Sequence, residues 1–164
     1  MEIRKTTNAD DFEAIGNLYA TSWKTAYQGI VPQAYLDELS GSRWASRLAT
    51  SDYDSYVLLQ GNTYIGTSAI APAREEGMAG WGEIISFYLL PEYWGKGYAK
   101  PLFSYVINAL QQGGWQNVYL WTLSENLRAQ RFYEKQGFEK TGETTTLSIG
   151  GKELTEVRYI KRLG

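Results

Sequence analysis

The 164-residue chain contains no cysteine and no histidine. These two absences exclude disulfide bonds, thiol nucleophiles, serine–histidine relays and the nitrogen and sulfur ligand sets that zinc prefers. We therefore expect no metal site. Any chemistry must use carboxylates, tyrosine, lysine, serine or backbone groups.

The chain also lacks an excess of charge of either sign, because 16 Lys and Arg stand against 18 Asp and Glu. A nearly neutral chain offers no electrostatic footprint for a nucleic-acid backbone or an anionic membrane, so we expect neither partner. No apolar run approaches the ~18 residues of a membrane span, and the first twelve residues contain no apolar signal-peptide core. We expect a cytoplasmic protein.

The chain has the length and composition of one folded domain, which we place at residues 1–164. Hydrophobic residues make up 43% and charged residues 21%, ordinary values that argue against disorder. Aromatic residues are abundant, with 13 Tyr and 6 Trp. They suit a pocket for a flat ligand and a well-filled core equally well, so composition does not choose between the two.

The first half of the chain predicts a strand, two helices and a hairpin. The strand covers residues 2–6, and Asn8 is the expected cap of a helix that carries one apolar stripe. A break at 23–30 and a second helix from Pro32 follow. The Gly61-Asn62 pair then joins two antiparallel strands, because it supplies the positive φ values of a tight hairpin turn.

The second half of the chain alternates strands with helices. After a loop at 72–80 we expect a strand at 81–90, a helix at 97–110, a strand at 117–123, a helix at 126–136 and two strands around Gly150-Gly151. Strand–helix–strand units need crossovers, whereas hairpins do not. The order predicts an α/β (α+β) fold with a mixed, mostly antiparallel sheet of about seven strands and helices on both faces.

One candidate binding motif is the loop between the strand at 81–90 and the next helix, Trp94-Gly95-Lys96-Gly97-Tyr98-Ala99. Its backbone N–H groups, with the positive end of the helix behind them, form an anion cradle suited to a pyrophosphate. Gly95 and Gly97 would let the backbone approach the phosphates, and Lys96 adds positive charge. Alone, the motif is equally consistent with an ordinary loop, and it matches neither nucleotide-binding glycine pattern.

A second motif lies on the following helix, where Asn126 and Tyr133 stand seven residues apart. At 3.6 residues per turn they share one helix face and could line one groove. The alternative is that Asn126 is a helix cap and Tyr133 a core aromatic. Alone, this motif decides nothing.

Together, the two motifs and their order resemble the GNAT superfamily of acetyl-CoA-dependent N-acetyltransferases, over essentially the whole chain. That family has (Gln/Arg)-x-x-Gly-x-(Gly/Ala) before one helix and Asn-x-x-Ala-x-x-(Phe/Leu)-Tyr-x-x-x-Gly-Phe in the next. The matching residues are Gly97, Ala99, Asn126, Ala129, Phe132, Tyr133, Gly137 and Phe138. Trp94 occupies the usual Gln/Arg position, which puts a side-chain contact to the pyrophosphate in doubt but leaves the backbone cradle intact.

The resemblance implies that acetyl-CoA is the acetyl donor and that the strand at 81–90 splays from its neighbour. The free backbone of that strand would bind the pantetheine arm and, near Leu89, the thioester oxygen. The implied cofactor-binding residues are Phe87, Tyr88, Leu89, Trp94, Gly95, Lys96, Gly97, Tyr98, Ala99, Asn126 and Tyr133. Tyr133 is also the implied catalytic residue that stabilises the departing thiolate.

Glu83 is the candidate catalytic base. It precedes Gly97 by 14 residues, a spacing at which some members of the family place a catalytic glutamate. Strand alternation predicts Glu83, Ile85 and Phe87 on one face. Partial desolvation should raise the pKa of Glu83, the direction that a base working near neutral pH requires. A solvated or salt-bridged glutamate is the alternative.

The resemblance implies acetyl transfer from acetyl-CoA to a primary amine of a small molecule, peptide or protein. Because no cysteine exists to carry an acyl group, direct transfer in a ternary complex is favoured. The acceptor should lie where the break at 23–30, the Gly77-containing loop and the final hairpin converge, with Trp23, Tyr27 and Glu83 as substrate-binding residues. We expect a monomer or homodimer. The alternative function is a non-catalytic module that binds or senses acyl-CoA.

Overall fold

Seven strands form one sheet in the computed structural model, which describes residues 1–164. Their order across the sheet is β1-β2-β3-β4-β5-β7-β6, and only β4 and β5 are parallel neighbours. The strands are β1 Glu2–Lys5, β2 Asp54–Gln60, β3 Thr63–Pro72, β4 Gly82–Leu89, β5 Asn117–Leu123, β6 Glu139–Ile149 and β7 Lys152–Arg162. The predicted mixed, mostly antiparallel sheet of seven strands is confirmed.

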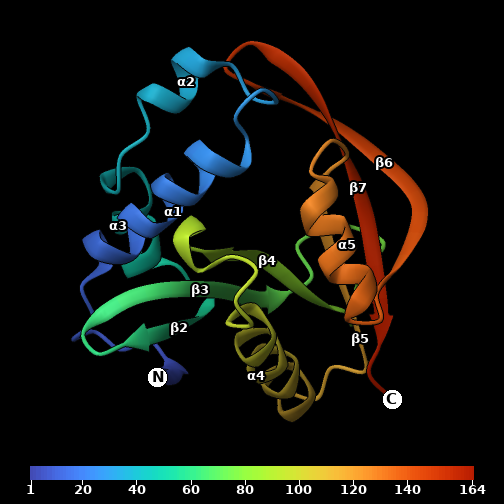
Figure 1. Cartoon of the computed structure of the whole chain (residues 1–164). Helices are drawn as coiled ribbons and strands as arrows, with labels where there is room; N and C mark the ends of the chain where they lie inside the picture. The colour runs from blue at the N-terminus through green and yellow to red at the C-terminus, as the bar shows by residue number, and fades with distance from the viewer.

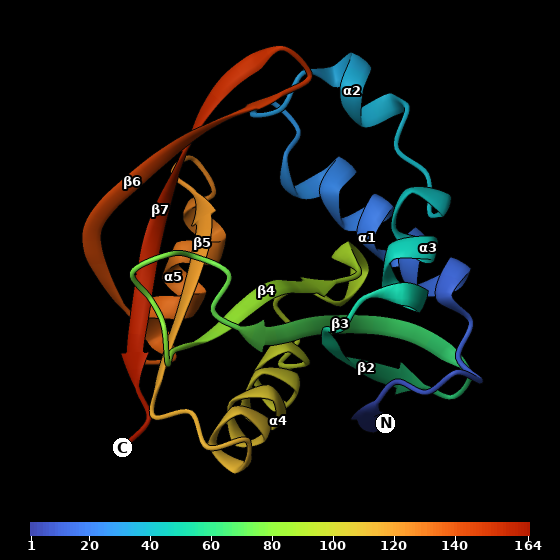
Figure 2. The ribbon, with the colours of Figure 1, turned by 180° about the vertical axis from the view of Figure 1, so that it is seen from behind.

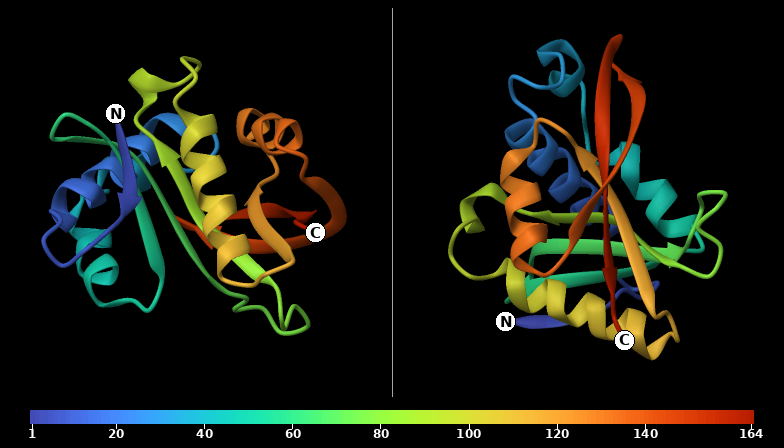
Figure 3. Two further views of the ribbon diagram at one scale, coloured as in Figure 1. Left: turned by 90° about the horizontal axis from the view of Figure 1, so that it is seen from below. Right: turned by 90° about the vertical axis from the view of Figure 1, so that its right-hand side faces the viewer.

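Helices cover both faces of this sheet (Figures 1 and 3). They are α1 Phe12–Ala26, α2 Gln33–Asp37, α3 Ser42–Thr50, the 3-10 helix η1 Pro91–Tyr93, α4 Ala99–Gln112 and α5 Leu127–Lys135. The first three share one apolar core with the sheet, and α4 and α5 share another on the opposite face. No helix is long and apolar enough to cross a membrane.

The start of α1 differs from its prediction. Asp11 rather than Asn8 caps the helix, because the Asp11 carboxylate accepts a hydrogen bond from the Ala14 N–H at 3.0 Å. The neighbouring Asp10 carboxylate is held by Arg4 of β1 and by Tyr64 of β3, which fixes the chain just before the helix. These contacts join segments distant in sequence, so local capping rules do not reveal them.

The expected break at 23–30 starts later than predicted, because α1 continues to Ala26. The prediction also missed α3, which crosses α1 at Gly16 and Gly41. A Cβ on either glycine would collide with the other segment, so the two backbones lie in close approach. The apolar side chain that α3 buries there is Trp44.

The final hairpin, β6 and β7, reaches across the molecule to the connection between α1 and α2 (Figures 1 and 2). At its tip, Gly150 lies against Tyr35 and Pro32, and the Lys152 ammonium donates to the Ile30 carbonyl at 2.9 Å. Residues near the two ends of the chain therefore enclose the same side of the sheet.

Candidate active site

The sheet opens between β4 and β5. These strands pair only at Gly82 with Val118 and at Glu83 with Tyr119, after which they diverge (Figure 2). The predicted splay of β4 is therefore confirmed. Because the next strand has moved away, one edge of β4 beyond Glu83 has no strand partner.

A single cavity of about 640 Å³ occupies this opening and reaches both faces of the sheet. On the face of α4 and α5 its lining includes Gly97, Lys100, Arg128, Phe132 and Lys135. On the face of α1 its lining includes Trp23, Tyr27, Trp121, Leu147, Ile149 and Glu156. The cavity thus connects two sets of side chains that the sheet would otherwise separate.

The loop before α4 has the geometry of an anion cradle, a name we use for the backbone of residues 95–100 together with Arg128. Gly95 and Gly97 have φ values of +69° and +88°, and a Cβ on either would point into open space. No N–H group of residues 95–100 donates a hydrogen bond within the protein, and no side chain caps α4. Free N–H groups at a helix start favour an anionic ligand such as a diphosphate.

The cofactor residues predicted in this loop divide into two sets. Trp94, Gly95, Gly97 and Ala99 line the cavity, whereas Lys96 and Tyr98 do not. The Tyr98 ring packs edge-on against Tyr93 instead. The cavity therefore meets the loop mainly through small residues and backbone.

Four cationic side chains line the cavity on this face: Lys100, Arg128, Arg131 and Lys135. The Arg128 guanidinium lies over the Trp94 ring, 3.5 Å from its centroid, and forms no ion pair. Burial lowers the pKa of Arg128. An unpaired, partly desolvated guanidinium beside free N–H groups suits a phosphate. The sequence analysis missed Arg128, although it lies inside the second motif, two residues after Asn126.

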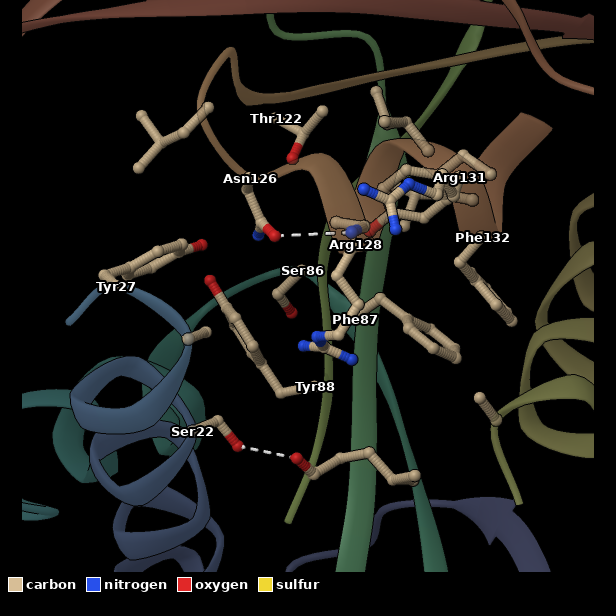
Figure 4. A pocket seen from close by; sticks show the side chains of 18 of the residues that line it. Ser22, Tyr27, Ser86, Phe87, Tyr88, Thr122, Asn126, Arg128, Arg131 and Phe132 are labelled. Carbon is tan, nitrogen blue, oxygen red and sulfur yellow. Dashed lines mark hydrogen bonds between the residues drawn. The ribbon is translucent and has the colours of Figure 1, made fainter. Parts of the chain in front are cut away.

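The open edge of β4 provides backbone groups to the cavity. The Leu90 N–H donates to Ile65 of β3, so by antiparallel alternation the N–H groups of Phe87 and Leu89 point away from β3. The Leu89 carbonyl accepts from the Ser22 hydroxyl at 3.0 Å (Figure 4) and from the Trp94 indole at 2.8 Å. These two bonds fix the end of β4 at the cavity wall.

Asn126 and Tyr133 both line the cavity, as the second motif predicted. Asn126 is also the cap of α5, since its side chain accepts from the Ala129 N–H at 3.3 Å. Thus the capping and groove interpretations of Asn126 both hold. Burial raises the pKa of Tyr133, whose hydroxyl has no hydrogen-bond partner, so this phenol stays protonated at neutral pH.

Trp23, Tyr27, Tyr88 and Trp121 form the aromatic walls of the cavity on the α1 face, and we call this part the aromatic chamber. The Trp23 indole donates to the Tyr88 hydroxyl at 3.0 Å, and the hydroxyls of Tyr27 and Tyr88 point toward one another (Figure 4). Two of the three segments predicted to surround the acceptor, the end of α1 with Trp23 and Tyr27 and the final hairpin, meet here, and their role in binding an acceptor stays a prediction. The final hairpin lines the chamber, but the Gly77-containing loop does not.

Glu83 differs from its prediction in two ways. The pairing of β3 and β4 skips Ile85, and this bulge puts Glu83 on the face of Ser86 and Tyr88 rather than with Phe87. Its carboxylate is buried in an ion pair with Arg74 at 2.7 Å and does not line the cavity. The prediction of one face for Glu83, Ile85 and Phe87 is therefore wrong.

The expected pKa shift of Glu83 is also wrong in sign. Burial acts to raise the pKa of Glu83, but hydrogen bonds from Arg74 and Tyr119 outweigh it and hold the pKa below its usual value. The carboxylate is thus a well-satisfied anion at the point where β4 and β5 part. Its role as the base stays a prediction.

Glu156 of β7 is a site residue that the sequence analysis missed. It is the one carboxylate that lines the cavity, and burial raises its pKa. Alternation along β7, with Val157 and Tyr159 in the core of the other face, could have placed it on the α1 face. Only the tertiary structure brings it opposite Leu123, beside the opening of the sheet.

Comparison with known proteins agrees with this geometry. The model of the acetyltransferase (GNAT) family matches residues 13–138. The uncharacterized N-acetyltransferase YuaI of Bacillus subtilis is 25% identical over 150 residues, 90% of this chain and 86% of that protein. The spermidine N(1)-acetyltransferase of Thermoplasma acidophilum is 25% identical over 144 residues, 85% of this chain and 88% of that protein.

Solved structures show the same fold. The ribosomal-protein-alanine N-acetyltransferase of Brucella melitensis has a TM-score of 0.76 at 19% identity, covering 99% of this chain and 100% of that chain. The PaiA N-acetyltransferase of Thermoplasma acidophilum, in complex with coenzyme A, has a TM-score of 0.73 at 23% identity, covering 98% of each chain. Both likenesses extend over nearly the whole chain.

A sheet split between two parallel strands, with an anion cradle at one mouth of the opening, suits a protein that binds a long ligand with a diphosphate group. The chain belongs to the GNAT family of acetyltransferases, so it is an acetyl-CoA-dependent acyltransferase.

Proposed function

We propose that the protein transfers the acetyl group of acetyl-CoA to a primary amine by direct attack in a ternary complex. The observation that carries this proposal is the cavity through the split sheet, which joins the anion cradle to the aromatic chamber. A donor and an acceptor that enter from opposite faces can meet at the open edge of β4. Holding two reactants together in this way supplies much of the rate enhancement of a group transfer.

Bound acetyl-CoA would supply the acetyl thioester. The free N–H groups of residues 95–100 and the Arg128 guanidinium would bind its diphosphate. The unpaired edge of β4 would bind the amide groups of the pantetheine arm, as an added strand would. The Phe87 and Leu89 N–H groups would then lie near the thioester.

Tyr133 is the proposed partner of the departing thiolate. Its hydroxyl lines the cavity, makes no hydrogen bond within the protein and stays protonated at neutral pH. A phenol has a higher pKa than a thiol, ~10 against ~8.5, so a hydrogen bond to the developing charge contributes more than complete proton transfer.

The donor half of the proposal is tested by thermal unfolding. A ligand at about 100 times its dissociation constant stabilises the folded state by about 2.7 kcal/mol, which for this chain length raises the melting temperature by on the order of 5 to 10 °C. We expect this shift with acetyl-CoA. No shift at millimolar acetyl-CoA would contradict the proposal.

Gly97→Val should abolish most of that shift, because its side chain would occupy the space of the phosphates. Gly142→Val is the matched control, since Gly142 has nearly the same φ, +87° against +88°, and lies outside the cavity. Both variants should lose some stability from backbone strain. Only the Gly97 variant should lose the response to acetyl-CoA.

The acceptor half is tested by release of free thiol from acetyl-CoA in the presence of amines. The panel contains phenethylamine, spermidine, an amino acid and a tripeptide with a free N-terminus. Amine-dependent thiol release with a matching acetylated product supports the transferase. Binding of acetyl-CoA without turnover of any amine would favour the acyl-CoA-sensing module instead.

A further inference from the structure

Glu156 is the one carboxylate in the wall of the cavity, and its surroundings set it apart from the other acidic residues. It lies on β7, paired with Leu123 of β5 and Thr145 of β6, on the sheet face covered by α1. It is half-buried, and its carboxylate makes no hydrogen bond or ion pair. A carboxylate kept partly away from water without a partner costs stability. Such a cost suggests that a ligand completes the site.

The charged and titratable groups that act on Glu156 come from three segments: the loop after β3, strand β4 and the end of α1. Arg74 and Glu83 act on its charge with opposite signs, and they are paired with each other at 2.7 Å. The hydroxyl groups of Tyr27 and Tyr88 are near enough that the charge of Glu156 helps to raise the pKa of both. Neither arginine on this face is free for Glu156, because Arg74 is paired with Glu83 at 2.7 Å and Arg158, two residues further along β7, is paired with Glu75 at 3.4 Å.

The position of Glu156 suits a group that acts on the acceptor. The carboxylate and the aromatic walls lie on the α1 face, whereas the four cationic side chains that line the cavity come from α4 and α5. Tyr133, the proposed partner of the thiolate, lines the same cavity as Glu156. A proton acceptor and a hydrogen-bond donor are thus placed around one small space. An amine that enters from the α1 face would find Glu156 as the one carboxylate of the cavity wall.

We propose that Glu156 binds the ammonium group of the acceptor and removes its proton, and that the acceptor is a primary amine with one positive charge on an apolar or aromatic body. This inference rests on the proposed function. The single carboxylate matches a single cation, and the aromatic walls would bind the rest of the molecule and stabilise its charge. A polyamine would leave further charges opposite no carboxylate.

The step balances without a further reactant. The Glu156 carboxylate takes one proton from the ammonium, and the freed nitrogen lone pair forms a bond to the thioester carbonyl carbon. The carbon–sulfur bond breaks, and its electron pair leaves on the thiolate, which accepts the hydrogen bond of Tyr133. The nitrogen loses its second proton to the thiolate as the amide forms, so the products are the amide, the free thiol of CoA and protonated Glu156, which returns its proton to solvent. Burial raises the pKa of Glu156, which is the direction required of a base.

The test compares Glu156→Gln with Glu153→Gln, an exposed residue on the same strand. With the best amine of the panel, Glu156→Gln should lower kcat/KM by about 100-fold and remove the acidic limb of the pH–rate profile. Glu153→Gln should leave both unchanged. The acetyl-CoA melting shift should be intact in both variants, which separates this inference from the proposed donor site. A wild-type kcat/KM and pH profile in Glu156→Gln would overturn the proposal.

The variant Glu83→Gln tests the competing hypothesis that Glu83 is the base. If Glu83 rather than Glu156 removes the proton, the acidic limb disappears in Glu83→Gln and persists in Glu156→Gln, and the proposal fails. If no amine of the panel is acetylated, the proposed function fails and this inference fails with it.

The melting temperature tests the state of Glu156 without an activity assay. A raised pKa in the folded state means that ionised Glu156 destabilises the fold at neutral pH. Glu156→Gln should therefore melt above the wild type at pH 7, and the gain should vanish below about pH 4, where the unfolded carboxyl is also protonated. A variant that melts below the wild type at pH 7 would show a structural partner and overturn the proposal.

A comparison of two amines tests the proposed class of acceptor. We expect phenethylamine to have a higher kcat/KM than spermidine, and Glu156→Gln to raise the KM for phenethylamine. A clear preference for spermidine would contradict the single-charge acceptor and would favour the activity that the name of the Thermoplasma relative states.

Discussion

At the scale of single residues, Trp94 shows how one departure from a family pattern is accommodated. Its indole N–H donates to the Leu89 carbonyl at 2.8 Å. The Arg128 guanidinium lies over its ring, 3.5 Å from the centroid. A cation–π contact orients a guanidinium without neutralising its charge. Where the family pattern has Gln or Arg, this chain has Trp94, and a guanidinium is brought to the same place by Arg128 of α5.

Arg128→Met should weaken acetyl-CoA binding by about 10- to 100-fold, the usual range for one charge-assisted hydrogen bond. The salt dependence of binding should fall as well, because one fewer charge faces the phosphates. Titration calorimetry at two salt concentrations measures both effects. Arg47→Met, on the exposed face of α3, is the control. Equal affinities in the Arg128 variant and the wild type would remove Arg128 from the anion cradle.

Tyr133→Phe should lower kcat by about tenfold or more and change the acetyl-CoA dissociation constant little. The hydroxyl acts on charge that develops only as the thiolate leaves, so its loss affects the rate rather than binding. Tyr105→Phe, on the exposed side of α4, is the control. An unchanged kcat would leave Tyr133 as a packing residue of the core.

At the scale of elements, the final hairpin lines the aromatic chamber and contacts α2 at its tip. Two adjacent glycines at the hairpin tip both have positive φ values, +61° at Gly150 and +82° at Gly151. A Cβ on Gly150 would lie 2.8 Å from the Tyr35 Cβ, whereas a Cβ on Gly151 would meet nothing within 4 Å. A comparison of substitutions at the two glycines therefore separates the effect of backbone strain from the effect of the contact with Tyr35.

Gly150→Ala should therefore lower the free energy of unfolding more than Gly151→Ala. Both variants incur about 1 to 2 kcal/mol of strain from the left-handed conformation, and Gly150→Ala also pushes the hairpin away from α2. Denaturant unfolding measures the difference. The Gly150 variant should also raise the acceptor KM, since the chamber opens. Equal losses of stability in the two variants would mean that the hairpin tip moves away from α2 at no measurable cost.

At the scale of the whole molecule, a buried carboxylate near the N-terminus joins several segments and makes the stability of the fold depend on pH. Asp10 accepts hydrogen bonds from Arg4 of β1, from the Thr7 N–H and from Tyr64 of β3. The Arg4 hydrogen bond, with the others, lowers the pKa of Asp10 well below its usual range. Because the folded pKa is depressed, this contribution to stability is present above the unfolded value of about 3.9 and is lost as pH falls.

Asp10→Asn should therefore be less stable than the wild type at pH 7. The difference in the free energy of unfolding should narrow steadily below about pH 4, because there the Asp10 carboxyl of the unfolded wild type binds a proton. Urea unfolding at a series of pH values measures both midpoints. A difference independent of pH would mean that Asp10 acts through packing rather than through its charge.

Much of the fold could be predicted from local sequence. Strand β5 begins and ends where the sequence predicts, at Asn117 and Leu123. Gly97 and Gly137 have the positive φ values expected of glycines around helices, and Asn126 caps α5. These features depend on residues within a few positions of one another, so propensity and spacing suffice. Helix α3 was missed because it is short and is stabilised largely by its contact with α1.

The sequence by itself indicated the family, the order of the elements apart from α3, and the loop that forms the backbone of the anion cradle. Only the tertiary structure decided which carboxylate lies in the cavity. The bulge at Ile85 turns Glu83 toward Arg74, and the pairing of β5 with β7 brings Glu156 beside the opening. Both depend on strand register between segments far apart in the chain, where a shift of one residue exchanges the two faces of a strand. No local pattern contains that information.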